Sequence, residues 1–228
     1  MNGPGRRRRW RRWTLAGLVL LIVIVVGGAA VFAKSQPSAA PLTLPAGLAR
    51  PPAGPADGTW NVTAGSVAGF RIRESALGFG NDVTGRTSAV TGTAVLVGGR
   101  VTSAAFRIGL AEITVGGKPS PQFAASLDTA AHPDATITLI GPVPLPAGFG
   151  AGRTVTAQYP GRLTLRGITR PVTITVSARR DGTMVEAAGS LQVASARWDI
   201  TLPAGFGFLG GLSSEATAEF LLILHRRQ

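Results

Sequence analysis

The stretch of sequence that decides the fold is "RLTLRGITRPVTITVSAR", residues 162–179. Apolar residues occupy every second position on both sides of an interruption over residues 167–171. They are Leu163 and Leu165 before the interruption, and Val172, Ile174 and Val176 after it. A side-chain period of two is typical of a strand with one apolar and one polar face, and two such runs around a short glycine-containing connection predict an antiparallel hairpin. The apolar face covers either a packed core or a bound molecule.

The same alternation recurs from Trp60 to Leu224, with turn signals between the runs, and predicts eight or nine strands. One helix is predicted over residues 119–133, where Phe123 and Leu127 are four residues apart and Pro133 would end the helix. This pattern indicates an all-β fold, either a sandwich or an up-and-down antiparallel β-barrel of about eight strands with one short helix. An eight-stranded barrel is wide enough to be filled by side chains or to hold one small ligand, and the pattern does not distinguish the two.

The positive charge of the chain is concentrated at its N-terminus. The net charge is +12, but six arginines lie within residues 6–12, and the chain from Pro51 onward carries 15 basic and 11 acidic residues. The predicted barrel therefore has no basic stripe of the kind that binds nucleic acid, and we expect no nucleic-acid partner.

Residues 14–33, "TLAGLVLLIVIVVGGAAVFA", contain no charged residue. Twenty helical residues span about 30 Å, the thickness of the hydrocarbon core of a bilayer, so this segment is predicted to be a single transmembrane helix. The arginines precede it, which places residues 1–13 in the cytoplasm and the rest of the chain outside the cytoplasm as a signal-anchored protein of the cell membrane and envelope. The alternative is a signal peptide cleaved after "VFA", which would leave a secreted or periplasmic protein.

Residues 34–57 form a Pro/Ala-rich linker with six prolines. Because proline lacks a backbone donor and fixes φ, neither helix nor sheet is expected there, and the segment is predicted to be a semi-extended tether. The barrel domain is assigned to residues 58–228.

Sequence motifs give little support for catalysis or for a cofactor. The chain has no cysteine and two histidines, His132 and His225, which lack a second metal ligand at useful spacing, and no pair of carboxylates suggests an acid–base couple. The motif "GFGFLG" at 205–210 matches G-x-G-x-x-G but lacks the βαβ context of a dinucleotide site. We therefore expect no catalytic residue, no metal site and no cofactor.

Three glycine-rich loops share a "LPAG" sequence, at residues 44–49, 145–150 and 202–207. Phe149, Phe206 and Phe208 would be exposed aromatic residues unless these loops covered apolar surface, so we expect them at the rim of the barrel.

Several blocks of the sequence resemble the YceI-like family in the family's order. They are "WNVTAGSVAGFRIRE" (60–74), "HPDATITL" (132–139), "GRLTLRGITRPVTITV" (161–176) and "GSLQVASARWDI" (189–200). The resemblance implies a lipocalin-like barrel whose elongated apolar cavity takes up a polyisoprenoid or a related amphiphilic chain. The chain differs from the family pattern at "ARWDI" (196–200), in the segment before Gln122 and in its predicted anchor.

These expectations together describe a membrane-tethered binding protein for an isoprenoid or other long-chain lipid. The alternatives are a filled-barrel structural or interaction module of the cell envelope, and an enzyme acting on a lipid. The predicted lining of the lumen consists of apolar-face residues: Phe70, Ile72, Phe106, Ile108, Ile137, Leu163, Leu165, Ile174 and Leu191. Arg166, Arg170 and Arg197 are predicted either to solvate the outer strand face or to pair with a head group at the mouth of the cavity.

Overall fold

The computed structural model describes residues 38–47, 49–76, 79–203 and 210–227. Its elements, in order, are β1 (Gly58–Val62), β2 (Val67–Ala76), β3 (Phe79–Thr87), β4 (Val90–Val97), β5 (Arg100–Gly109), β6 (Thr114–Val115), β7 (Lys118–Pro119), α2 (Pro121–Leu127), β8 (Asp134–Leu139), β9 (Val143–Pro144), β10 (Val155–Leu165), β11 (Ile168–Asp181), β12 (Met184–Ala194), the 3₁₀ turn η1 (Ser195–Trp198) and β13 (Gly210–Arg226).

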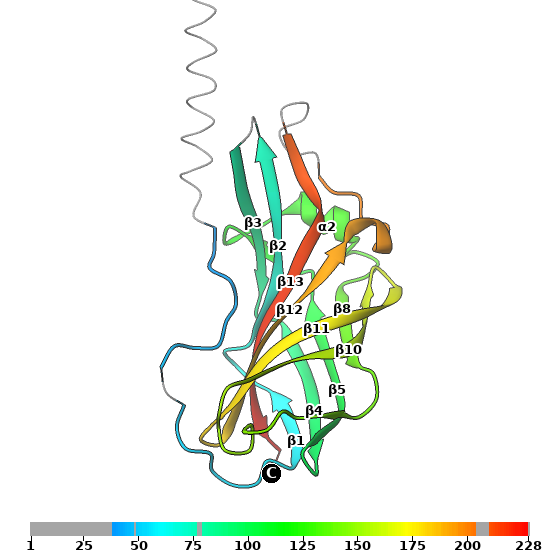
Figure 1. Cartoon of the computed structure of the whole chain (residues 1–228). Helices are drawn as coiled ribbons and strands as arrows, with labels where there is room; N and C mark the ends of the chain where they lie inside the picture. The colour runs from blue at the N-terminus through cyan, green and yellow to red at the C-terminus, as the bar shows by residue number, and fades with distance from the viewer. Residues whose placement is uncertain (1–37, 48, 77–78, 204–209, 228) are drawn as a thin grey trace, which may run out of the picture.

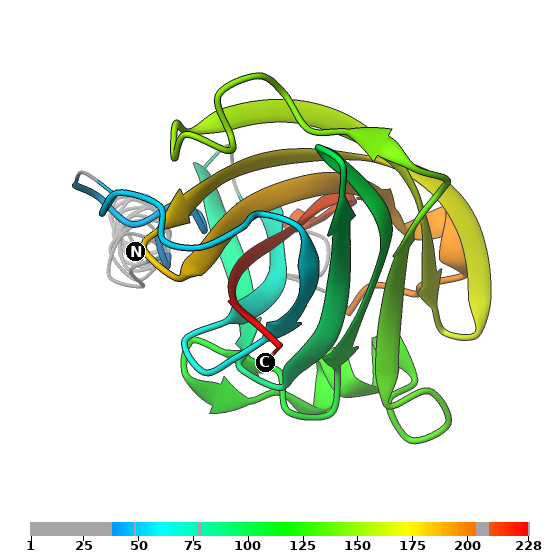
Figure 2. The same cartoon turned by 90° about the horizontal axis from the view of Figure 1, so that it is seen from below.

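Eight antiparallel strands close into a ring. Their order is β1–β4–β5–β8–β10–β11–β12–β13, and pairing between β1 and β13 completes the circle. Figure 2 looks along the barrel and shows these strands arranged in a ring. β2 and β3 extend the sheet beyond β13, and the short β6 and β7 continue it. Closure leaves the strands of the ring without an unpaired edge.

The sheet branches at the segment between β1 and β2. Both strands pair with the 17-residue β13, β1 through Leu224–Arg226 and β2 through residues 210–221. Between them, the Ser66 hydroxyl donates to the Thr63 carbonyl (2.8 Å) and accepts from the Ile223 amide (2.9 Å). These bonds satisfy backbone groups at the point where the chain leaves one pairing and enters the next.

The hairpin predicted from residues 162–179 is present, with a shorter connection than expected. The turn contains only Arg166 and Gly167, and both have positive φ (50° and 71°), as a two-residue type I′ turn requires. Pro171 lies within β11 and not in the interruption. The strand tolerates the proline because the pairing of β11 with β12 begins only at Thr175, so no backbone hydrogen bond to β12 is lost at residue 171.

The predicted helix at 119–133 is correct in place but wrong in extent. α2 contains seven residues, Pro121–Leu127, and ends because Asp128 adopts a left-handed conformation with φ of 52°. The chain then forms turns before β8, so Pro133 is not the residue that ends the helix.

The predicted membrane span, 14–33, lies outside the described residues. Within the described part of the chain, no helix combines the length and the apolar character that crossing a membrane would need. Residues 38–57, with 48 left undescribed, form no helix or strand and run along the outer wall of the barrel (Figure 1).

The interior contains two apolar clusters, one toward each end of the barrel. One includes Leu163, Leu191 and Trp198, and the other includes Trp60 and Leu224. Phe106, Ile108 and Phe220 are packed against both clusters.

Candidate functional site

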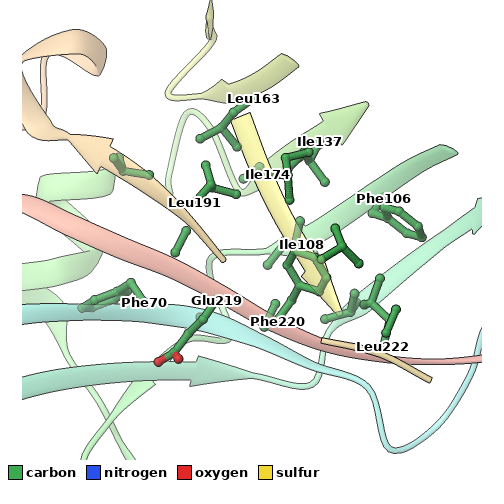
Figure 3. Close-up of a pocket in the computed structure, with 18 of the residues that line it drawn as sticks. Phe70, Phe106, Ile108, Ile137, Leu163, Ile174, Leu191, Glu219, Phe220 and Leu222 are labelled. Carbon is green, nitrogen blue, oxygen red and sulfur yellow. The ribbon is translucent and has the colours of Figure 1, made fainter. Parts of the chain in front are cut away.

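The barrel encloses a cavity of about 280 Å³. Its walls come from the inward faces of the ring strands, from β2 and from α2, and they are almost wholly apolar. Figure 3 shows apolar side chains from different strands converging on this space. The volume lies near the lower end of the range for small-molecule sites in proteins.

All nine residues that the sequence predicted for the lining are found on the cavity wall: Phe70, Ile72, Phe106, Ile108, Ile137, Leu163, Leu165, Ile174 and Leu191. Their participation in binding stays a prediction. The strand register explains their convergence, since Ile137 is directly opposite Phe106 on β5 and Leu163 on β10. Three inward-facing side chains thus form a row across three adjacent strands.

Other residues of the cavity wall were not predicted from the sequence. β13 contributes Phe220, Leu222 and Leu224. The alternation of β13 is hidden in the sequence, because the intervening Leu221 and Ile223 are also apolar and are half-buried on the outer face. Phe123 and Leu127 of α2 also line the cavity, although their four-residue spacing predicted only a helix.

The two ends of the cavity differ in exposure. At the end near the C-terminus, the lining residues Trp60, Phe149 and Leu224 are at most 3 % exposed. At the other end, Phe70, Phe123 and Leu127 line the cavity but are only half-buried. Phe70 and Phe123 lie with ring centroids 5.1 Å apart. We call this second end the mouth and the first the closed end.

Few polar groups reach the wall. Among the described residues, no lysine, arginine or histidine lines the cavity. Burial raises the pKa of the Tyr159 phenol above its ordinary value, because the phenolate would be desolvated. The Glu219 carboxylate, in contrast, is turned away from the apolar side chains (Figure 3) and bonds Arg86 on the outer wall at 2.5 Å.

The three arginines singled out in the sequence connect the β10–β11 turn to η1. Arg166 donates to the Trp198 carbonyl (3.4 Å), Arg170 to the Arg197 carbonyl (3.3 Å) and Arg197 to the Pro171 carbonyl (3.1 Å). None of them lines the cavity. In this structure they brace two neighbouring segments and place no charge in the lumen.

The three glycine-rich loops do not share one location. The loop at 145–150 lies at the closed end, where Phe149 is 3 % exposed and lines the cavity. Residues 44–47 lie on the outer wall instead of at the rim, because Arg179 donates to the carbonyls of Pro45 and Gly47. Phe206 and Phe208, with most of the G-x-G-x-x-G motif, lie outside the described residues.

Within the described part of the chain, no group of three histidine, aspartate or glutamate side chains is arranged to hold a metal ion. His132 lies beside the β10–β11 turn at Gly167, and His225 is an exposed residue at the end of β13.

The sequence pattern of the YceI-like domain matches residues 60–220. The chain belongs to the YceI-like family. The barrel is similar to a polyisoprenoid binding domain from Saccharophagus degradans implicated in plant cell wall breakdown, with TM-score 0.56 and 16 % identity over 75 % of this chain and 99 % of that one. It is also similar to Burkholderia cenocepacia BcnA, with TM-score 0.52 and 18 % identity over 71 % and 98 %. At these identities the likeness concerns the fold. No protein with a curated description matches the chain significantly.

Proposed function

We propose that this YceI-like barrel takes up a polyisoprenoid or similar amphiphilic lipid chain in its lumen. The observation that carries the proposal is the apolar cavity with a half-exposed aromatic mouth. Each CH₂ transferred from water to such a wall contributes about 0.8 kcal/mol, so a long chain needs few polar contacts to bind. Since no cationic side chain reaches the described wall, the guest places its chain inside and a charged head group remains at the mouth.

The similarity to a polyisoprenoid binding domain supports the same class of ligand. The proposed role is binding without catalysis. The barrel is proposed to be anchored in the cell membrane by residues 14–33, with residues 1–13 in the cytoplasm and the barrel outside it.

Co-purification of a lipid tests the binding proposal directly. We expect solvent extraction of the purified full-length protein, followed by mass spectrometry, to give a long-chain lipid in stoichiometric amount. A lipid-free protein that also fails to bind a fluorescent polyisoprenoid analogue would show that the barrel is a filled structural module. Chemical conversion of the lipid by the protein would instead indicate an enzyme.

Substitution of one wall residue tests where the guest lies. Ile174→Trp places an indole in the cavity, and we expect it to abolish uptake of the analogue with little loss of stability. Val172→Trp is the matched control, because Val172 lies two residues away on the same face of β11 and is buried in the core without lining the cavity. Overpacking at Val172 should cost about 1–3 kcal/mol of unfolding free energy. Equal destabilisation by both variants would indicate a packed interior at Ile174.

The anchor has its own test. An alkaline phosphatase, which is active only outside the cytoplasm, is fused after Gln228, and we expect it to be active in the membrane fraction. Activity in the soluble fraction with a mature N-terminus near Lys34 would show a cleaved signal peptide, and an inactive fusion would reject the proposed topology.

A further inference from the structure

The segment that precedes β1 is attached to the barrel along its length. Residues 38–47 and 49–54, which we call the strap, lie along the outer wall of the barrel and are hydrogen-bonded to side chains of β2, β3, β11 and β13. At one end Arg71 of β2 donates to the Ser38 hydroxyl (3.1 Å) and the Ala39 carbonyl (2.6 Å). At the other end the Ala53 amide donates to the Gly182 carbonyl (2.8 Å) in the β11–β12 turn.

Buried charges hold the middle of the strap. Glu219 is 5 % exposed, accepts from the Leu42 amide (3.0 Å) and is paired with Arg71 and Arg86. Arg179 and Glu186 form a second buried pair at 2.7 Å, and the free nitrogens of Arg179 donate to the carbonyls of Pro45 and Gly47. A charge this deeply buried is stable only when paired and hydrogen-bonded, so the barrel wall and the strap depend on each other.

The composition of the strap suits this contact. Prolines remove N–H donors and leave carbonyl oxygens unpaired, whereas an arginine side chain has five N–H donors and no acceptor. Arg180, 4 % exposed, likewise donates to the carbonyls of Ala53 and Gly54. A proline-rich segment over an arginine-rich wall is therefore complementary along its length.

The direction of the strap fixes which end of the barrel is near residue 38. Figure 1 shows the described chain beginning beside β3 in the half of the barrel that holds α2 and running toward the β11–β12 turn at the opposite end. The first end contains the mouth formed by Phe70 and Phe123, and the second is the closed end with Trp60 and Phe149.

Only five residue steps separate Ala33 from Ser38. Such a segment spans at most about 18 Å even when fully extended. If the whole linker from residue 34 to β1 were free, the barrel could take any orientation relative to the predicted span. Because the strap is docked on the barrel, only the residues between Ala33 and Ser38 remain to connect the two.

We propose that the strap holds the barrel with its mouth directed at the bilayer, so that a lipid chain moves between membrane and lumen without crossing bulk water. The lipid surface is the partner of the mouth. This inference rests on the proposed anchor at residues 14–33 and adds a fixed orientation to it.

Orientation is measured on the full-length chain in liposomes of phosphatidylcholine and phosphatidylglycerol. The sequence has no cysteine, so single substitutions give unique labelling sites. Gln122→Cys labels the exposed side of α2 at the mouth, and Val97→Cys labels the β4–β5 turn, where Val97 is 53 % exposed. With a quencher attached to lipid head groups, we expect strong quenching of a fluorophore at position 122 and weak quenching at position 97.

A length variant is the matched control. Inserting about 20 Gly/Ser residues after Ala33 adds a flexible coil of about 25 Å and leaves every strap contact in place, so the fold is retained. We expect this variant to bind the polyisoprenoid analogue in detergent as the parent does, but to lose the difference in quenching between the two labels.

Three results would overturn the inference. These are equal quenching of both labels in the parent chain, stronger quenching at position 97, and a contrast that the insertion leaves unchanged. Cosedimentation with liposomes and analogue binding in detergent report separately on the anchor and the lumen. A chain that cosediments and binds the analogue but shows no contrast would keep the proposed function and reject the orientation.

Discussion

At the scale of single residues, Tyr159 offers a direct probe of the cavity wall. It is the only tyrosine in the sequence, it lines the cavity, and it is half-buried. Because burial raises the pKa of its phenol, folding favours the neutral form over the phenolate. This contribution to stability is complete below the ordinary pKa of 10.0 and is lost as the pH rises through the higher value of the folded protein.

Ultraviolet absorbance of the tyrosinate should therefore report the folded-state pKa of one group. We expect an apparent pKa above that of the unfolded chain in urea, and a further rise when the polyisoprenoid analogue occupies the lumen and excludes water. Tyr159→Phe should flatten the alkaline loss of stability. Identical titration curves for the free and the analogue-loaded protein would place the guest away from Tyr159.

At the scale of elements, the β10–β11 and β4–β5 hairpin turns have the same backbone. Arg166 and Gly167 have φ of 50° and 71°, and Gly98 and Gly99, between β4 and β5, have φ of 57° and 72°. The surroundings of the two turns differ. A Cβ on Gly167 would lie 2.9 Å from Cε1 of His132, whereas a Cβ on Gly99 would meet nothing within 4 Å.

Alanine at either glycine should cost about 1–2 kcal/mol of unfolding free energy for the left-handed backbone. We expect Gly167→Ala to cost more than Gly99→Ala in urea unfolding, since His132 must also move. His132→Ala in the Gly167→Ala background should remove that excess. If the two glycine variants were equally destabilised, the β10–β11 turn would relax without disturbing His132.

Alternation in the sequence was sufficient to predict most of the strands and nine of the inward-facing residues of the wall. The period of two specifies the face of each side chain, and Leu163, Leu165 and Ile174 are all on the cavity side. The same pattern did not predict the length of β13, where Leu221 and Ile223 interrupt the alternation because the outer face is itself half-buried. α2 was predicted too long, because the left-handed conformation of Asp128 is set by the local fold.

The strap was not predictable from local sequence. Prolines correctly indicated a segment without helix or strand, but its contacts join residues far apart in the chain. Leu42 and Glu219 are 177 positions apart, and Gly47 and Arg179 are 132 apart. Glutamates that would ordinarily be solvated on an outer strand face are buried here only because a distant segment covers them, and no periodicity in the sequence signals that contact.

At the scale of the whole molecule, the closed ring of strands surrounds a lumen that its own side chains do not fill. The strap lies on the outer wall of this ring. An apolar cavity without a guest loses packing contacts on one side of each wall residue. In the proposed function, a bound chain restores those contacts and binds only the folded barrel, so we expect occupancy of the lumen to stabilise the fold by mass action.

The size of this stabilisation can be measured by thermal unfolding. At a free analogue concentration 100 times its dissociation constant the gain is about 2.7 kcal/mol, which for a domain of this size corresponds to a rise in Tm of about 5–10 °C. We expect this rise for the delipidated parent protein and for Gly99→Ala, whose added Cβ meets nothing within 4 Å, but not for Ile174→Trp, whose lumen is occupied. A short-chain alcohol that carries the same polar group without the isoprenoid tail should give no shift, because the proposed binding free energy comes from burial of the tail. A shift that persisted in Ile174→Trp would mean that the analogue binds the folded protein outside the barrel, and the lumen would then lose its proposed role.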